Sequence, residues 1–272
     1  MNNVLNESLY KKQNNRFNKI NDLSKQFSGA YCGTMILRNS IFGIVENYAR
    51  KKELFLEILR YPFCDDELWA FTFVKKGTIF LCVNSELAMC KQIFAVAHEL
   101  YHIHCYAENI DNCIRNGSLL DSRTVNDVAI SQEDLEANAF AGLLLMPDAR
   151  MQDQMLLFDL HGTNIKFDDI LTLMELFALP YKAVILRLFE GQIITEDEAN
   201  ELLKYDADFV SERINITGKA KQWQLNSKEI VHLGSLLDNF TFNITNEFLT
   251  ESREYDDTMY LKNLKKGFQY ER

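Results

Sequence analysis

The sequence has few of the residues that interrupt regular structure. Among 272 residues there are three prolines and eleven glycines, which argues against long disordered linkers and against a turn-rich all-β fold. It also lacks a hydrophobic run long enough to span a membrane, and its polar first residues hold no signal-peptide core. With 47% hydrophobic and 25% charged residues, the composition is that of a globular protein with a sizeable core.

The six cysteines form no recognisable disulfide framework or zinc-finger pattern. No two of them are spaced as in a Cys-x-x-Cys motif. In a chain of this size without an export signal, such cysteines are typically reduced and mostly buried. We therefore expect a cytoplasmic location and no association with a membrane.

Positive charge is scarce as well, and the formal net charge is −10. An acidic chain gains no general electrostatic affinity for nucleic acid, so phosphate binding would need a local basic patch. The best candidates are residues 218–221 and 262–266, and both are short. We therefore expect no direct binding to nucleic acid.

The clearest β signal is a hairpin at residues 68–83, in which two runs rich in aromatic and β-branched residues flank Lys75-Lys76-Gly77. Helical periodicity dominates elsewhere, and one helix is expected to begin with Asn84 and Ser85 as its N-cap pair. The sequence thus predicts an α+β fold, mostly helical, with a small sheet and a helical C-terminal extension. The predicted helices are at about 5–27, 41–59, 86–104, 132–146, 167–188 with a break near 180, 196–203, 227–239 and 260–268.

The most informative motif is His98-Glu99-Leu100-Tyr101-His102, within the helix predicted at 86–104. His98 and His102 are four residues apart, so both imidazoles project from one face of a helix and can bind one metal ion. Buried imidazoles also need partners for their nitrogens, which a metal provides. Glu99 is adjacent to this face rather than on it, so its carboxylate can reach a metal-bound water as a general base. The motif predicts a zinc site with Glu99 as the catalytic residue.

A catalytic zinc site takes three protein ligands and leaves the fourth position to water. The helix predicted at 132–146 offers three carboxylates for the missing ligand, from Glu133, Asp134 and Glu136. Acidic residues in a first turn also stabilise the helix dipole without any metal. The residue types alone do not decide which of these three carboxylates is the third ligand.

Taken together, the two helices resemble the ImmA/IrrE metallopeptidases. The resemblance is carried by residues 94–102, Phe-Ala-Val-Ala-His-Glu-Leu-Tyr-His, and residues 136–147, Glu-Ala-Asn-Ala-Phe-Ala-Gly-Leu-Leu-Leu-Met-Pro. It covers about residues 65 to 150 and continues more loosely to about 190. It implies a zincin-like metallopeptidase core that binds one zinc ion.

The resemblance also bears on the third ligand. Family members usually carry a Glu ligand four residues before the Asn or Asp of the second motif, and four residues before Asn138 this chain has Asp134. Helix geometry agrees, because Asp134 and Asn138 share a face while Glu133 and Glu136 point elsewhere. We predict Asp134 as the third ligand and Glu136 as the second choice, with Asn138 orienting a ligand histidine.

The activity implied by the resemblance is that of an intracellular regulatory zinc endopeptidase. In the implied mechanism Glu99 takes a proton from the zinc-bound water and returns it to the leaving amine. Such proteins often act on a DNA-binding repressor, so the expected partner is a protein substrate, with a transcriptional repressor as one candidate. Tyr101, Tyr106 and His161 are candidates for stabilising the oxyanion, although each is more typical of a structural residue.

Two alternatives stay open. Asp in place of Glu as the third ligand would suit a catalytically weak or inactive zincin-fold protein that binds a regulatory partner. Residues 167–188 could instead be a helix-turn-helix, although only Lys182 and Arg187 are basic there. The expected domains are a peptidase core with N-terminal helices, a small helical subdomain, and a C-terminal extension of unknown role, at residues 1–160, 161–204 and 205–272.

Overall fold

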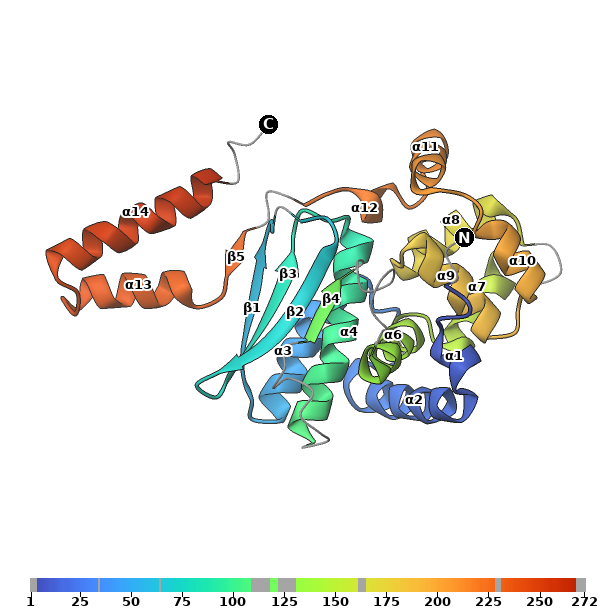
Figure 1. Cartoon of the computed structure of the whole chain (residues 1–272), viewed down its shortest axis with the longest axis horizontal. Helices are drawn as coiled ribbons and strands as arrows, with labels where there is room; N and C mark the ends of the chain where they lie inside the picture. The colour runs from blue at the N-terminus through green and yellow to red at the C-terminus, as the bar shows by residue number, and fades with distance from the viewer. Residues whose placement is uncertain are drawn as a thin grey trace.

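The computed structural model of this chain describes residues 4–33, 35–63, 65–108, 118–121, 131–160, 165–227 and 231–267. In these residues, one five-stranded sheet is covered by helices on one face, and further helices lie beyond these (Figure 1). The predicted α+β fold with a small sheet is therefore confirmed.

The helices, in chain order, are α1 (Leu9–Lys12), α2 (Asn14–Phe27), the π-helix η1 (Ser28–Cys32), the 3-10 helix η2 (Arg38–Ser40), α3 (Ile41–Lys51), α4 (Met89–Ala107), α6 (Gln132–Leu145), α7 (Asp148–Leu157), α8 (Phe167–Phe177), α9 (Tyr181–Glu190), α10 (Glu196–Leu202), α11 (Ala207–Thr217), α12 (Lys221–Gln224), α13 (Leu236–Thr245) and α14 (Glu251–Gly267). The strands are β1 (Phe55–Tyr61), β2 (Leu68–Lys75), β3 (Thr78–Asn84), β4 (Ser118–Asp121) and β5 (His232–Leu233).

The sheet is mixed, with the strand order β4-β2-β3-β1-β5. β1 runs parallel to β3, while the β2–β3, β2–β4 and β1–β5 pairs are antiparallel. The hairpin predicted at 68–83 is confirmed as β2 and β3. Lys76 and Gly77, between the two strands, both have positive φ angles (52° and 80°), as the tight two-residue turns of hairpins require.

Two of the predicted helices are wrong in part. The helix expected at 41–59 stops at Lys51, and β1 follows it because pairing with β3 and β5 on both sides outweighs the helical pattern. Glu53, with a φ of 55°, marks the reversal between the two elements. Of the helix expected at 227–239, residues 228–230 lie outside the described residues, and the described part contains β5 and the start of α13 instead.

The predicted start of the metal-motif helix is also wrong. α4 begins at Met89, five residues after the expected N-cap pair of Asn84 and Ser85. Asn84 ends β3 instead, where its side chain accepts hydrogen bonds from the amides of Phe63 and Glu86 and donates to the carbonyls of Asp65, in the β1–β2 connection, and of Leu68, the first residue of β2. An amide side chain satisfies both donors and acceptors of a tight connection, which explains this use of the residue.

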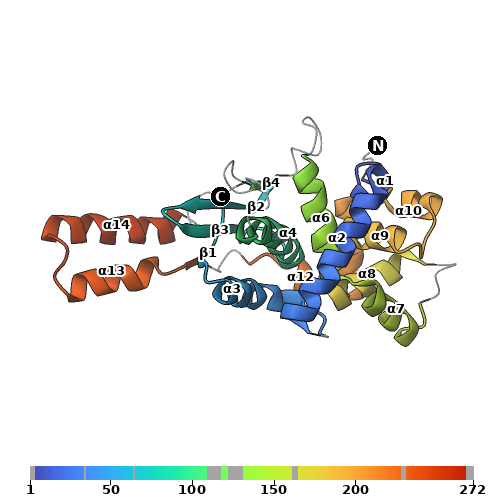
Figure 2. The same cartoon turned by 90° about the horizontal axis from the view of Figure 1, so that it is seen from below.

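The helices lie in layers beside the sheet. α3 and α4 pack on one face of the sheet, α6 lies next to α4, and α2 lies next to α6 (Figures 1 and 2). α4 and α6 are buried along most of their length, as expected of helices that are apolar on nearly every side. The α4–α6 pair is thus the buried centre of the helical layers.

The helix pair predicted at 167–188 is present as α8 and α9. Arg187 is buried, where it forms ion pairs with Asp148 and Glu190 and donates to the carbonyl of Met146. These contacts tie α9 to α6 and α7. Within the described residues, no helix is long and apolar enough to cross a membrane.

Candidate metal centre

Three side chains that can ligate a metal meet between α4 and α6. His98 and His102 are one turn apart on α4 and are buried, and their Nε2 atoms are 3.3 Å apart. Asp134, in the first turn of α6, places its Oδ1 atom 3.8 Å from His98 Nε2 and 3.6 Å from His102 Nε2. Among the residues that the structure describes, this is the group of His, Cys, Asp and Glu side chains whose spacing could hold a metal ion.

The spacing fits a tetrahedral ion. Zinc binds imidazole nitrogen and carboxylate oxygen at about 2.0–2.2 Å, so its ligand atoms lie roughly 3.3–3.6 Å from one another. The three observed separations of 3.3, 3.6 and 3.8 Å between the ligand atoms agree with this range to within about 0.2 Å. Two imidazoles and one carboxylate are three protein ligands, so a fourth position stays open. This set of ligands is typical of a hydrolytic rather than a structural zinc site.

Asn138 sets the orientation of His98. The two residues lie on facing helices, and Asn138 Oδ1 is 2.9 Å from His98 Nδ1. Burial and the neighbouring His102 lower the pKa of His98 to about 3, against the opposing effects of Asp134 and Asn138, so the ring is neutral near pH 7. A neutral ring that donates Nδ1–H to Asn138 directs the lone pair of Nε2 toward His102 and Asp134.

Ser131 sets the orientation of Asp134. Its Oγ caps α6 by accepting a hydrogen bond from the Asp134 amide (3.1 Å) and donates to Asp134 Oδ2 (2.7 Å). This contact leaves Oδ1 toward the two imidazoles. Burial acts to raise the pKa of Asp134, but hydrogen bonds from His102 and Ser131 and the nearby imidazoles outweigh it and lower that pKa overall. The carboxylate is therefore ionised, as a ligand must be.

Glu136, the second choice for the third ligand, contacts residues other than His98 and His102. Arg16 on α2 binds it with two hydrogen bonds of 2.6 and 2.8 Å, and Gln132 and Tyr101 donate to it at 2.9 and 2.5 Å. Burial acts to raise the pKa of Glu136, but these donors lower it overall. The structure therefore brings Asp134, and not Glu136, to the two histidines.

Glu99 is fully buried on α4, next to His98 in sequence. Burial raises the pKa of the Cys82 thiol on β3 to about 12, and the charge of Glu99 adds to that effect. The structure thus places the predicted catalytic residue in a buried position on the helix that carries His98 and His102.

The other histidine and tyrosines of the region have separate contacts. Tyr101 donates its hydroxyl to Glu136, so this group is engaged away from the histidine pair. His104 Nδ1 lies 2.9 Å from the Tyr48 hydroxyl, outside the three-residue group. Tyr106 packs against the hydrophobic core. His161 lies outside the described residues.

Comparison with known families gives a match to the IrrE N-terminal-like domain, a metallopeptidase family, over residues 52–189. This segment is 138 of the 272 residues and contains His98, His102 and Asp134. The chain belongs to this metallopeptidase family. This match confirms the resemblance inferred from the two motifs. No curated protein sequence matches the chain.

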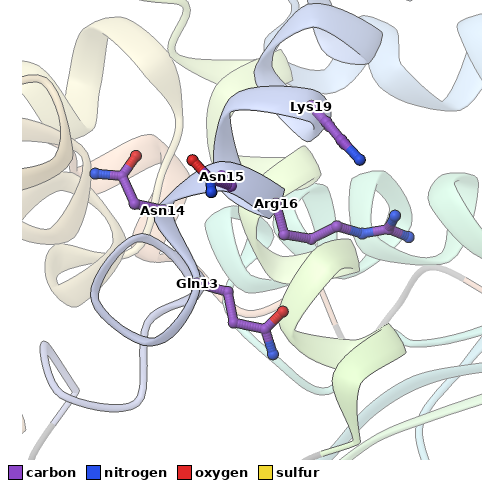
Figure 3. A pocket seen from close by; sticks show the side chains of 5 residues that line it. All are labelled: Gln13, Asn14, Asn15, Arg16 and Lys19. Carbon is purple, nitrogen blue, oxygen red and sulfur yellow. The ribbon is translucent and has the colours of Figure 1, made fainter.

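The IrrE N-terminal-like domain of this chain is extended by α2, which precedes the matched segment. Gln13 and Arg16 extend from α2 toward α6, and with Asn14, Asn15 and Lys19 they line a surface hollow of about 460 Å³ (Figure 3). Sequence reasoning did not predict Arg16, because nothing in a polar helix indicates its distant partner. It could have found the capping role of Ser131, because serine three residues before Asp134 is a common N-cap pattern.

Proposed function

We propose that this protein is a zinc-dependent endopeptidase whose metal is held by His98, His102 and Asp134. The observation that carries the proposal is the convergence of these three side chains at tetrahedral spacing, with Asn138 and Ser131 orienting two of them. A bound zinc ion would acidify a water molecule and polarise a peptide carbonyl. Family membership supports the assignment as a peptidase.

In the proposed reaction Glu99 moves the proton. Its carboxylate accepts a proton from the attacking water and delivers it to the amine that leaves when the peptide bond breaks. Asn138 and Ser131 keep the histidine and aspartate in place and do not themselves react.

The proposed substrate is a protein. The similarity to ImmA/IrrE peptidases makes a DNA-binding repressor the first candidate, and the proposed role is regulatory. We also propose a cytoplasmic location, which is supported by the four described cysteines that are free thiols and buried, at Cys32, Cys82, Cys90 and Cys105.

Zinc binding is tested by elemental analysis of the purified protein and of a His98→Ala/His102→Ala double variant. We expect one zinc per chain in the first and none in the second. Asp134→Ala should also lose zinc, whereas Glu136→Ala should keep it. Equal zinc in the wild type and the double variant would refute the proposed centre.

Catalysis is tested separately with Glu99→Gln. This change keeps the size of the side chain and removes the proton acceptor, so zinc should remain while cleavage of a candidate repressor falls by at least about 100-fold. Cleavage at the wild-type rate would refute the role of Glu99. Zinc binding without cleavage by either protein would instead support the alternative of a zincin-fold protein that binds its partner without hydrolysing it.

A further inference from the structure

The C-terminal helices α13 and α14 carry an apolar surface that the described part of the chain leaves exposed. Both project from the sheet at the β5 edge in the two views (Figures 1 and 2). Ser235, just before α13, is fixed to β1 by two hydrogen bonds to Glu57. Among the described residues, seven of the sixteen large exposed hydrophobic side chains lie between residues 236 and 260: Leu236, Leu237, Phe242, Phe248, Tyr255, Met259 and Tyr260.

These helices gain little stability from the rest of the chain. α13 has ten residues, and none of its side chains is buried. Isolated helices shorter than about 12–15 residues are marginal in water, and most helices in proteins are stabilised by burying an apolar face. In α14, Tyr255 and Tyr260 are 67% and 62% exposed. The exposed apolar residues of α13 and α14 thus have the character of a surface that another molecule covers.

The charges of α14 indicate which molecule. Residues 251–257 contain four acidic residues and one arginine, a net charge of −3, and residues 258–266 contain three lysines and no acid, a net charge of +3. A second α14 lying antiparallel would place each acidic half beside a basic half, whereas a parallel one would oppose like charges. A helix that is complementary to itself in this way favours a second copy of the same chain.

We propose that α13 and α14 form a two-fold symmetric interface with a second copy of this chain, in which the two α14 helices lie antiparallel. The apolar area is sufficient for such an interface. Phe242, Phe248, Tyr255 and Tyr260 are 59–68% exposed, which at about 200 Å² per aromatic side chain offers roughly 500 Å² per copy and roughly 1,000 Å² for the pair. Specific interfaces begin at about this size.

Light scattering of the full-length protein at increasing concentration tests the proposal. The mass is expected to rise from 31.6 kDa to twice that value, 63.2 kDa, over the micromolar range that suits an interface of this size. Tyr255→Ser/Met259→Ser removes two exposed side chains one helical turn apart and should weaken association at least about tenfold. A matched control is Leu156→Ser on α7, which is 84% exposed and should leave association unchanged.

Charge-reversal variants test the same interface independently of its apolar residues. Lys262→Glu places an acid in the basic half and should weaken association, whereas Lys221→Glu on α12 changes the same charge outside the interface and should have no effect. Higher salt should weaken the dimer as well. A monomer up to about 200 µM, which excludes any useful affinity, would overturn the proposal. A dimer that withstands Tyr255→Ser/Met259→Ser would overturn it too. Neither result would bear on zinc content or on the proposed peptidase activity.

Discussion

Arg16 is expected to stabilise the peptidase domain from outside the segment that defines the family. Its guanidinium binds the Glu136 carboxylate at 2.6 and 2.8 Å, and the Arg16 side chain is 44% exposed while that of Glu136 is 3% exposed. Breaking a fully buried ion pair costs about 3–5 kcal/mol, and losing an exposed one costs at most about 1 kcal/mol. Because one partner is largely solvated, we expect Arg16→Met to lower the free energy of unfolding by about 2 kcal/mol.

The assay is urea unfolding at pH 7 in the presence of a chelator, so that zinc does not contribute. A loss of about 2 kcal/mol corresponds to a Tm lower by roughly 4–8 °C for a protein of this size. Lys19→Met is the control, because Lys19 lies one turn further along α2 and lines the same hollow. It removes the same charge without touching Glu136, and its unfolding free energy should stay within about 0.5 kcal/mol of the wild type.

A double-mutant cycle decides whether the loss comes from the ion pair. Without Arg16, Glu136 keeps two neutral hydrogen-bond donors, Tyr101 and Gln132. Its buried charge then has no cationic partner, and this unpaired charge is the main reason that the free energy of unfolding falls. Glu136→Gln removes that charge, so Arg16→Met/Glu136→Gln should be more stable than Arg16→Met alone. If the two single effects simply add, the pair is not coupled and the account of Arg16 is wrong.

Other predictions concern the metal centre and the α6–α9 contact. Asn138→Ala should weaken zinc affinity about 10- to 100-fold, because His98 loses the acceptor that orients it. Zinc titration against a chelating dye measures this change. The control is Asn138→Asp, which keeps an acceptor oxygen and should retain most of the affinity. Adding zinc at about 100 times its Kd should raise the unfolding free energy by about 2.7 kcal/mol, and the His98→Ala/His102→Ala variant should show no such gain. Gly142→Ala should destabilise the protein by about 1–3 kcal/mol, because the new Cβ would lie 2.9 Å from Arg187 Cδ; unfolding at the wild-type midpoint would contradict it.

The sequence predicted those parts of the structure that depend on short-range pattern. Two runs rich in aromatic and β-branched residues and the Lys75-Lys76-Gly77 turn sufficed for the β2–β3 hairpin, and the spacing of His98 and His102 sufficed to place the two imidazoles on one helix face. The first five residues of β1, 55–59, were predicted as helix, because they become a strand through pairing with β3 and β5, which are distant in sequence. Arg16 was missed for a related reason, since its partner Glu136 is 120 residues away.

The third ligand shows how the two kinds of information combine. Residue types alone left three carboxylates, and helix periodicity with the family spacing favoured Asp134. The structure adds what periodicity cannot show, namely that Arg16 and Tyr101 already occupy the carboxylate of Glu136. Asp134 is a shorter residue than the usual Glu, yet it lies 3.6 and 3.8 Å from the two imidazoles, so the substitution does not remove the carboxylate from the site.

The most direct test of the central claim is a crystal structure of the zinc-loaded protein with anomalous diffraction collected at the zinc edge. We predict one anomalous peak between α4 and α6, at about 2.0–2.2 Å from His98 Nε2, His102 Nε2 and Asp134 Oδ1, with a fourth position open to water. A peak bound to Glu136 in place of Asp134, or no peak between the two helices at saturating zinc, would contradict the account.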